Sequence, residues 1–138
     1  LLDRRLIRDL LLDLARGMVE TSPAVVDRAA HLERLLAACQ SDLERHFLRF
    51  LEEHDLRLPD AAQELIEDCG TRPDFVYRYE MVAVYVDGPI HDQPDIEAED
   101  RLVEERLMRA GWLPVRFRYG EDWNELVKDH KQVFGASG

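Results

Sequence analysis

The most informative stretch of the sequence is MVAVYVDGP, residues 81–89. Residues 81–86 are apolar at every position, which is typical of a strand buried on both faces of a sheet. Asp87-Gly88-Pro89 follows as a turn signal and ends the apolar run. We therefore expect residues 81–86 to form a central strand.

The chain after this strand predicts a parallel crossover. Apolar residues at helical spacing indicate a helix from Asp95, as its N-cap, to about Ala110, where Gly111 ends it. Residues 113–119 alternate apolar and basic side chains, which is typical of a half-buried strand. This order favours a right-handed connection between two parallel strands. The side chains expected to point inward are Ile96, Leu102, Val103, Leu107 and Ala110 in the helix, and Val115, Phe117 and Tyr119 in the strand.

The chain before the strand predicts a helix and two further extended segments. The capping box formed by residues 41–44 begins a helix that stops near residue 54, and residues 61–67 and 73–79 have the composition of short strands. A second capping box at residues 122–125 begins a final helix. The apolar face of the first of these helices comprises Leu43, Phe47, Leu48, Phe50 and Leu51. The fold class is therefore α/β: a helix, a three-strand meander, a helix, a strand and a helix, giving a mixed sheet flanked by helices.

Residues 1–38 form a separate helical extension in this interpretation. An apolar stripe predicts a helix over residues 1–19, and Ser22 and Pro23 suit the first positions of a second helix that runs to about residue 38. The sequence begins at Leu1 in the middle of such a pattern, so we expect it to be a piece of a longer protein. We predict a second domain over residues 39–138.

The composition limits the classes of function. The 138 residues contain 18 Lys and Arg against 29 Asp and Glu, a formal net charge of -11. This balance argues against an autonomous nucleic-acid binder, because affinity for phosphate comes mainly from basic residues. Two cysteines make no disulfide framework, and no apolar run is long enough to span a bilayer. We therefore expect a cytoplasmic protein without membrane contact.

Polar residues cluster where the predicted strands begin and end. Asp74 begins one strand, Asp87 ends its antiparallel neighbour, and His91 follows four residues later. The start of one strand faces the end of the next in a hairpin, so Asp74 and Asp87 should lie close together. Two such carboxylates suit Mg²⁺, and a nearby imidazole can transfer a proton. Each residue also has a purely structural interpretation, because Asp-Gly turns and capping aspartates are common.

Other acidic residues have weaker functional interpretations. The capping box already gives Glu44 a structural role beside any role in a metal site. The acidic residues between 97 and 105 are typical of a solvated helix face, although Asp100 and Arg101 are candidates to reach back to the strand ends.

The sequences RPDFV (residues 72–76) and VAVYVDGPIH (residues 82–91) resemble the core of the very-short-patch-repair (Vsr-like) endonucleases. These enzymes belong to the PD-(D/E)xK restriction-endonuclease superfamily, and the resemblance covers about residues 41–134. Similar domains are found at the C-termini of DEAD/DEAH-box helicases, and residues 1–11 resemble the segment that precedes such a domain.

The resemblance implies a metal-dependent DNA endonuclease acting in DNA repair or in defence against foreign DNA. It makes Asp74 the metal-binding aspartate of the PD motif, with Asp87 and the backbone carbonyl of Val86 as further ligands of Mg²⁺ or Mn²⁺. It also implies that His91 assists the attacking water or the leaving group, and that Glu44 is the glutamate of the first helix. DNA would be delivered by the rest of the parent helicase, and the isolated fragment would bind nucleic acid weakly.

The chain departs from the superfamily in two respects. The acidic-x-Lys pair is absent, since the aligned triplet is Tyr85-Val86-Asp87, and the structural zinc ligands of the mismatch enzymes are missing. Two hypotheses therefore stand: an active nuclease module, or a catalytically degenerate nuclease fold that positions DNA or binds another protein.

Overall fold

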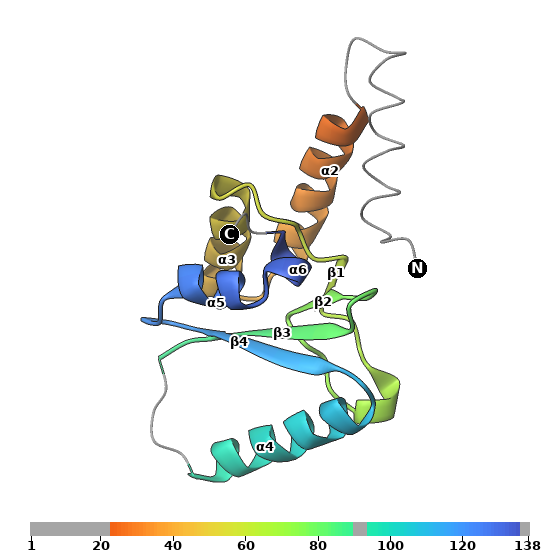
Figure 1. The fold of residues 1–138 in the computed structure, drawn as a ribbon, viewed down its shortest axis with the longest axis vertical. Helices are drawn as coiled ribbons and strands as arrows, with labels where there is room; N and C mark the ends of the chain where they lie inside the picture. The colour runs from red at the N-terminus through yellow and green to blue at the C-terminus, as the bar shows by residue number, and fades with distance from the viewer. Residues whose placement is uncertain (1–22, 90–93, 136–138) are drawn as a thin grey trace. The chain divides into compact units, whose positions relative to one another are not determined.

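The computed structural model describes residues 23–89 and 94–135 (Figure 1). The chain divides after Ala37 into two compact units, residues 1–37 and residues 38–138. Helix α2, Pro23–Ala38, confirms the predicted second helix. The helix expected over residues 1–19 and the cap at Ser22 lie outside the described residues.

The second unit is built on one four-stranded mixed sheet with the order β1-β2-β3-β4. The strands are β1 (Ala61–Ala62), β2 (Phe75–Tyr77), β3 (Val82–Asp87) and β4 (Leu113–Arg118). The first three strands pair antiparallel and β4 pairs parallel with β3, which confirms the predicted meander and parallel connection. The first segment is shorter than predicted, because the chain leaves the sheet after two residues and forms the short 3-10 helix η1, Glu67–Cys69.

Helices cover both faces of this sheet (Figure 1). Helices α3 (Asp42–Glu53), α5 (Trp123–Asp129) and α6 (Lys131–Phe134) lie on one face, and α4 (Pro94–Arg109) lies on the other. The single final helix expected from the sequence is divided at His130, which ends α5 and precedes α6. The described chain is thus a mixed α/β protein, as the sequence predicted.

Aromatic side chains form the core between the sheet and helix α3. The ring of Phe47 lies 5.3 Å from Phe75 on β2 and 4.6 Å from Phe117 on β4. Trp123 and Phe134 complete the cluster from α5 and α6. Phe47 and its two partners on the sheet, Phe75 and Phe117, are fully buried. This packing holds α3 against β2 and β4.

Several predicted core positions are solvent-exposed instead. Leu102 and Tyr119 are 58% and 65% exposed. Leu43 is only partly buried, and the neighbouring Glu44 takes the inward position in α3. Helix α4 begins at Pro94, so Asp95 lies inside the helix and is not its N-cap.

The central strand is fully buried over only its first half. Residues 82–84 are buried, whereas residues 85–87 are partly exposed. The register explains the difference, because β2 begins with Phe75 opposite Val84 and residues 85–87 pair with β4 alone. Strand β3 therefore ends in a segment with one free edge, beside the residues predicted to carry the chemistry.

Candidate functional site

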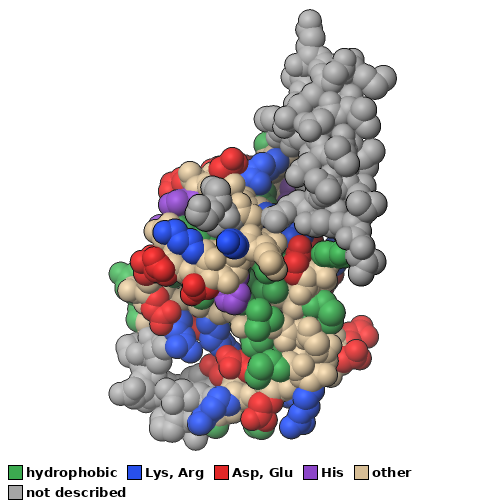
Figure 2. Space-filling model, in the orientation of Figure 1, with side chains coloured by type: hydrophobic (Ala, Val, Ile, Leu, Met, Phe, Trp, Pro, Cys, Tyr) green, Lys and Arg blue, Asp and Glu red, His purple; other side chains and the backbone are tan. Residues whose placement is uncertain are grey.

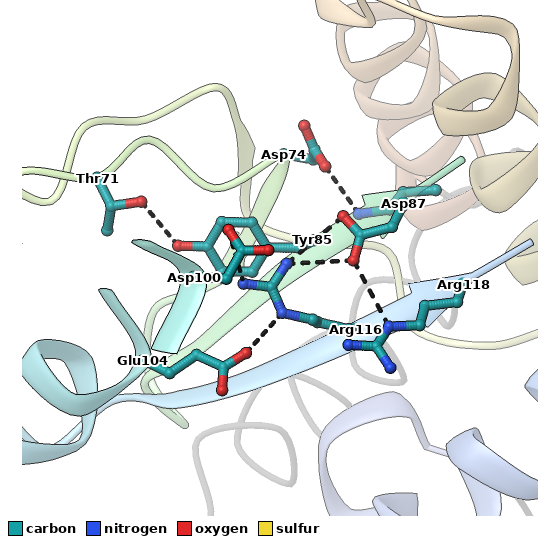
Figure 3. Close-up of polar contacts among 9 residues, drawn as sticks. Thr71, Asp74, Tyr85, Asp87, Asp100, Glu104, Arg116 and Arg118 are labelled. Carbon is teal, nitrogen blue, oxygen red and sulfur yellow. Dashed lines mark hydrogen bonds and ion pairs between the residues drawn. The ribbon is translucent and has the colours of Figure 1, made fainter. Parts of the chain in front are cut away.

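The free edge of β3 is covered by the side chain of Asp74, the residue that precedes β2. Asp74 Oδ2 accepts a hydrogen bond of 2.7 Å from the backbone N–H of Val86 (Figure 3). A residue in a strand directs its N–H and C=O to the same edge, so the carbonyl of Val86 also faces the Asp74 side. Because β2 begins only at Phe75, the Asp74 carboxylate takes the place of a backbone carbonyl as the hydrogen-bond acceptor for Val86.

Glu44 from helix α3 joins Asp74 through a shared partner, Gln63. One nitrogen, Nε2 of Gln63, donates to Glu44 Oε1 at 2.9 Å and to Asp74 Oδ1 at 3.4 Å. Glu44 is 4% exposed and is the one charged residue that is buried in the described part of the chain. The two carboxylates therefore converge on a single nitrogen, Glu44 from a buried position and Asp74 from a partly exposed one.

Glu44 is held in this position by the capping box of α3. The Ser41 hydroxyl donates to Glu44 Oε2 at 2.8 Å, and the Glu44 backbone N–H donates back to Ser41 Oγ at 3.1 Å. The backbone N–H of Gln40 adds a longer bond of 3.3 Å to Glu44 Oε1. The capping role predicted for Glu44 is therefore confirmed, and it leaves Oε1 directed at Gln63.

The Asp74–Glu44 pair is electrostatically unfavourable in the absence of a cation. Burial raises the pKa of Asp74 above its ordinary value, and the charge of Glu44 raises it further, although the Val86 hydrogen bond lowers it. Within the described residues, no lysine or arginine forms an ion pair with either carboxylate. Two carboxylates held together by neutral donors alone favour a bound cation.

Asp87 lies in a second acidic cluster, which is centred on Arg116 (Figure 3). The guanidinium of Arg116 binds Asp87 at 3.1 Å, Glu104 at 2.6 Å and Asp100 at 3.8 Å. Burial alone lowers the pKa of Arg116, but the hydrogen bond to Glu104 and the charge of Asp87 raise it above its ordinary value. Arg116 thus stays charged and joins β4 to β3 and α4.

An aromatic side chain completes this second cluster. The Arg116 guanidinium lies 4.6 Å from the ring centre of Tyr85, its direct partner in the β3–β4 register. The Tyr85 hydroxyl hydrogen-bonds Thr71 Oγ1 at 2.8 Å. Tyr85 therefore contributes an arginine–aromatic contact to this cluster.

The structure therefore distributes the predicted site residues over two clusters. It brings Asp74 together with Glu44, and it places the backbone of Val86 beside Asp74. The carboxylate of Asp87 is paired with Arg116, with Arg118 3.9 Å away. His91 lies outside the described residues. Asp100 reaches back toward the strand end as anticipated, through Arg116, whereas Arg101 is exposed.

Two residues of these clusters were not identified from the sequence. The sequence contained a pattern that could have identified Arg116. This residue alternates with Val115 and Phe117, so it lies on the opposite face of the predicted strand, and an acidic helix covers that face. No pattern in the sequence identifies Gln63. Its role depends on where strand β1 ends, and the composition of residues 61–67 does not indicate that the strand has only two residues.

Charge on the surface of the second unit is mixed. Acidic and basic side chains are interspersed over the face shown in Figure 2, and the described part of this face has no broad basic area. In residues 23–89 and 94–135, no three His, Cys, Asp or Glu side chains are grouped so as to hold a metal ion. None of the described helices is long and apolar enough to cross a membrane.

Comparisons with known proteins return no match. No protein-family model matches the sequence, and neither a curated protein nor a solved structure matches it significantly.

Proposed function

We propose that residues 39–138 are a metal-dependent phosphodiesterase module, a DNA endonuclease of the Vsr-like, PD-(D/E)xK type. The observation that carries the proposal is the convergence of Glu44 and Asp74 on one amide nitrogen, beside the free edge of a central strand. The order of helix, three antiparallel strands, helix and parallel strand supports a restriction-endonuclease-like fold.

The chemistry of the donor set fits a hard divalent cation. Carboxylate and carbonyl oxygens are the ligands that Mg²⁺ and Mn²⁺ prefer, and Mg²⁺ sites in proteins often use only one or two carboxylates with water and substrate phosphate. Glu44, Asp74 and the carbonyl of Val86 would hold the ion, with Asp87 nearby in the outer sphere. When bound, such an ion polarises the scissile phosphate and lowers the pKa of an attacking water.

The protein side chains have separate tasks in this proposal. Asp74 and Glu44 hold their positions through Val86 and the capping box, so the site is preorganised by the backbone. His91, which follows the end of β3, is the candidate for proton transfer to or from the reacting groups.

The charge of the chain supports delivery of DNA by another domain. A net charge of -11 repels a phosphate backbone, and a single divalent ion offsets only part of it. We therefore propose that a helicase portion of a longer protein brings DNA to this module, and that the isolated chain binds DNA weakly.

The test is cleavage of plasmid and branched DNA by the 138-residue chain with Mg²⁺ or Mn²⁺. Wild type should cut, Asp74→Ala should abolish cutting, and Asp129→Ala should cut like wild type, because Asp129 is exposed at the end of α5. Circular dichroism of each variant would verify folding. Equal inactivity of wild type and Asp74→Ala, in this chain and in any longer protein that contains it, would refute the nuclease proposal.

A second candidate function is supported by the Arg116 cluster. The side chain of Asp87 is committed to an arginine, and Tyr85 replaces an acidic residue of the superfamily pattern. Both features fit a catalytically degenerate nuclease fold that positions DNA or binds a protein partner. Metal-dependent cleavage that requires Asp74 would exclude this candidate.

A further inference from the structure

We infer that Gln63 is the third side-chain ligand of the divalent cation, beside Glu44 and Asp74, and that its side-chain amide occupies the cation position when no metal is bound. This inference rests on the proposed function, because it assumes that Glu44 and Asp74 hold the ion. It adds a ligand that the superfamily motifs do not include.

The Gln63 amide lies between the two carboxylates, where a bound cation would lie. Its Nε2 atom is the single donor shared by Glu44 Oε1 and Asp74 Oδ1, at 2.9 and 3.4 Å. An NH₂ group carries partial positive charge and has two hydrogens, so it can bridge two acceptors as a weak replacement for an ion. A divalent cation placed between the same two oxygens would displace this nitrogen.

The same amide can supply an oxygen once the ion is bound. In the metal-free chain the two carboxylates are acceptors only, and this orients the NH₂ end of Gln63 toward them. A cation between the carboxylates reverses the preference, because amide carbonyl oxygens are ligands of hard cations. The change requires rotation about the terminal side-chain torsion of Gln63, which has a broad and shallow profile.

The backbone of Gln63 is held in an unusual conformation at this point. Its φ angle is 56°, in the left-handed region that non-glycine residues rarely adopt. The Gln63 N–H donates to the backbone carbonyl of Asp74 at 3.0 Å, directly beside the β1–β2 pairing. The amide is therefore anchored to the same backbone that positions Asp74.

The other carboxylate near Asp74 is already neutralised. Asp87 raises the pKa of Asp74 through its charge, but its own oxygens bind Arg116. Gln63 is thus the side chain in the described residues that contacts both carboxylates and keeps an oxygen to offer.

The experiment measures binding of MnCl₂ to the 138-residue chain by isothermal titration calorimetry, with Asp74→Asn as the site control. Gln63→Gly removes the ligand and permits the positive φ, so affinity should fall about tenfold or more. Asp55→Gly is the matched backbone control, because Asp55 has a φ of 53°, is exposed and lies in the turn after α3; its Mn²⁺ affinity should equal that of wild type.

Gln63→Glu tests the ligand role without removing the side chain. A third carboxylate should increase Mn²⁺ affinity about tenfold, because affinity follows ligand charge. It should also lower the melting temperature in EDTA, because the bridging donor becomes a third negative charge.

The outcomes separate this inference from the proposed function. If Mn²⁺ binding depends on Asp74 and is equally strong in wild type and Gln63→Gly, the inference is overturned while a nuclease site remains. If Mn²⁺ binding requires both Asp74 and Gln63 but DNA is never cut, the inference stands and the nuclease activity fails. Absence of any Asp74-dependent Mn²⁺ binding overturns the inference.

Discussion

Two acidic clusters lie at the same end of strand β3, and they are neutralised in different ways. In the Arg116 cluster, Asp87, Glu104 and Asp100 surround the guanidinium of Arg116. In the Gln63 cluster, Glu44 and Asp74 accept hydrogen bonds from the neutral amide of Gln63 and from backbone or hydroxyl donors. The Arg116 cluster thus has a positively charged side chain at its centre, whereas the carboxylates of the Gln63 cluster form no ion pair among the described residues.

This difference assigns a different role to each cluster. Arg116 comes from β4 and contacts β3 and α4, so it joins three elements of the fold and leaves Asp87 with little capacity for a ligand. Glu44 and Asp74 keep their mutual repulsion, which a ligand of opposite charge would relieve. The Arg116 cluster is therefore structural, and the Gln63 cluster is the candidate for binding.

The largest expected effect comes from removing the cation of the structural cluster. Arg116→Met should lower the free energy of unfolding by about 3 kcal/mol, because the acidic residues around a partly buried arginine would lose their partner. This is the lower end of the range for buried pairs, since Asp87 and Glu104 are 31% and 30% exposed. Urea denaturation followed by circular dichroism measures the loss.

Arg118→Met is the matched control for this substitution. Arg118 also faces Asp87, but at 3.9 Å and with 44% of its side chain exposed, so its loss should cost less than about 1 kcal/mol. Equal losses for the two variants would show that the Arg116 cluster has no special structural role.

A smaller effect is expected from magnesium. At ten times its dissociation constant, Mg²⁺ should stabilise the wild-type chain by about 1.4 kcal/mol, through its binding to the folded state alone. Glu44→Gln should remove this gain while it preserves the helix cap, because Gln also serves at this position of a capping box. Thermal melting with MgCl₂ and with EDTA measures the effect.

Glu104→Gln is the corresponding change in the other cluster and should retain the magnesium gain. If MgCl₂ raises the melting temperatures of Glu44→Gln and Glu104→Gln by similar amounts, the ion binds elsewhere. If MgCl₂ does not stabilise the wild-type chain, there is no cation site at Glu44.

The contrast between the clusters also explains what could be predicted from the sequence. The apolar run at residues 81–86 and the alternation in residues 113–119 determine the central pair of strands, because burial enforces their pattern. Asp74 was identified as a candidate from its place at the start of a predicted strand, whereas Glu44 was a candidate only through the family resemblance, because its capping box indicated a structural role. The partners that distinguish the clusters are Arg116 and Gln63. They lie far along the chain from the carboxylates that they contact, so only the tertiary structure brings them together.

The same reasoning accounts for the errors. Tyr85 and Val86 are apolar and were expected to be buried on both faces, but the length of β2 decides their burial, and β2 begins at Phe75. Leu102 follows the helical pattern of α4, yet its side chain is exposed. Neither strand length nor the limits of a covering helix are encoded in local periodicity.

The smallest expected effect is a pH-dependent gain in stability for Asp74→Asn in EDTA. Asn keeps an oxygen for the Val86 N–H, and Gln63 can turn to present its own oxygen to the new amide. The pKa of Asp74 is raised in the folded chain, mainly by burial and then by Glu44. The contribution of Asp74 to stability is therefore full below the pKa of the unfolded state and is lost as the pH rises through the folded pKa.

The variant should consequently melt at a higher temperature than wild type at pH 7, and the difference should shrink toward pH 3, where both chains are neutral at this position. Solvent screening limits the gain to no more than about 1 kcal/mol. In a Glu44→Gln background the gain should become smaller yet persist, because burial is the larger cause. A gain that is the same at pH 3 and pH 7 would mean that the Asp74 charge is not the destabilising feature, and that the Gln63 cluster lacks the unbalanced charge that distinguishes it from the Arg116 cluster.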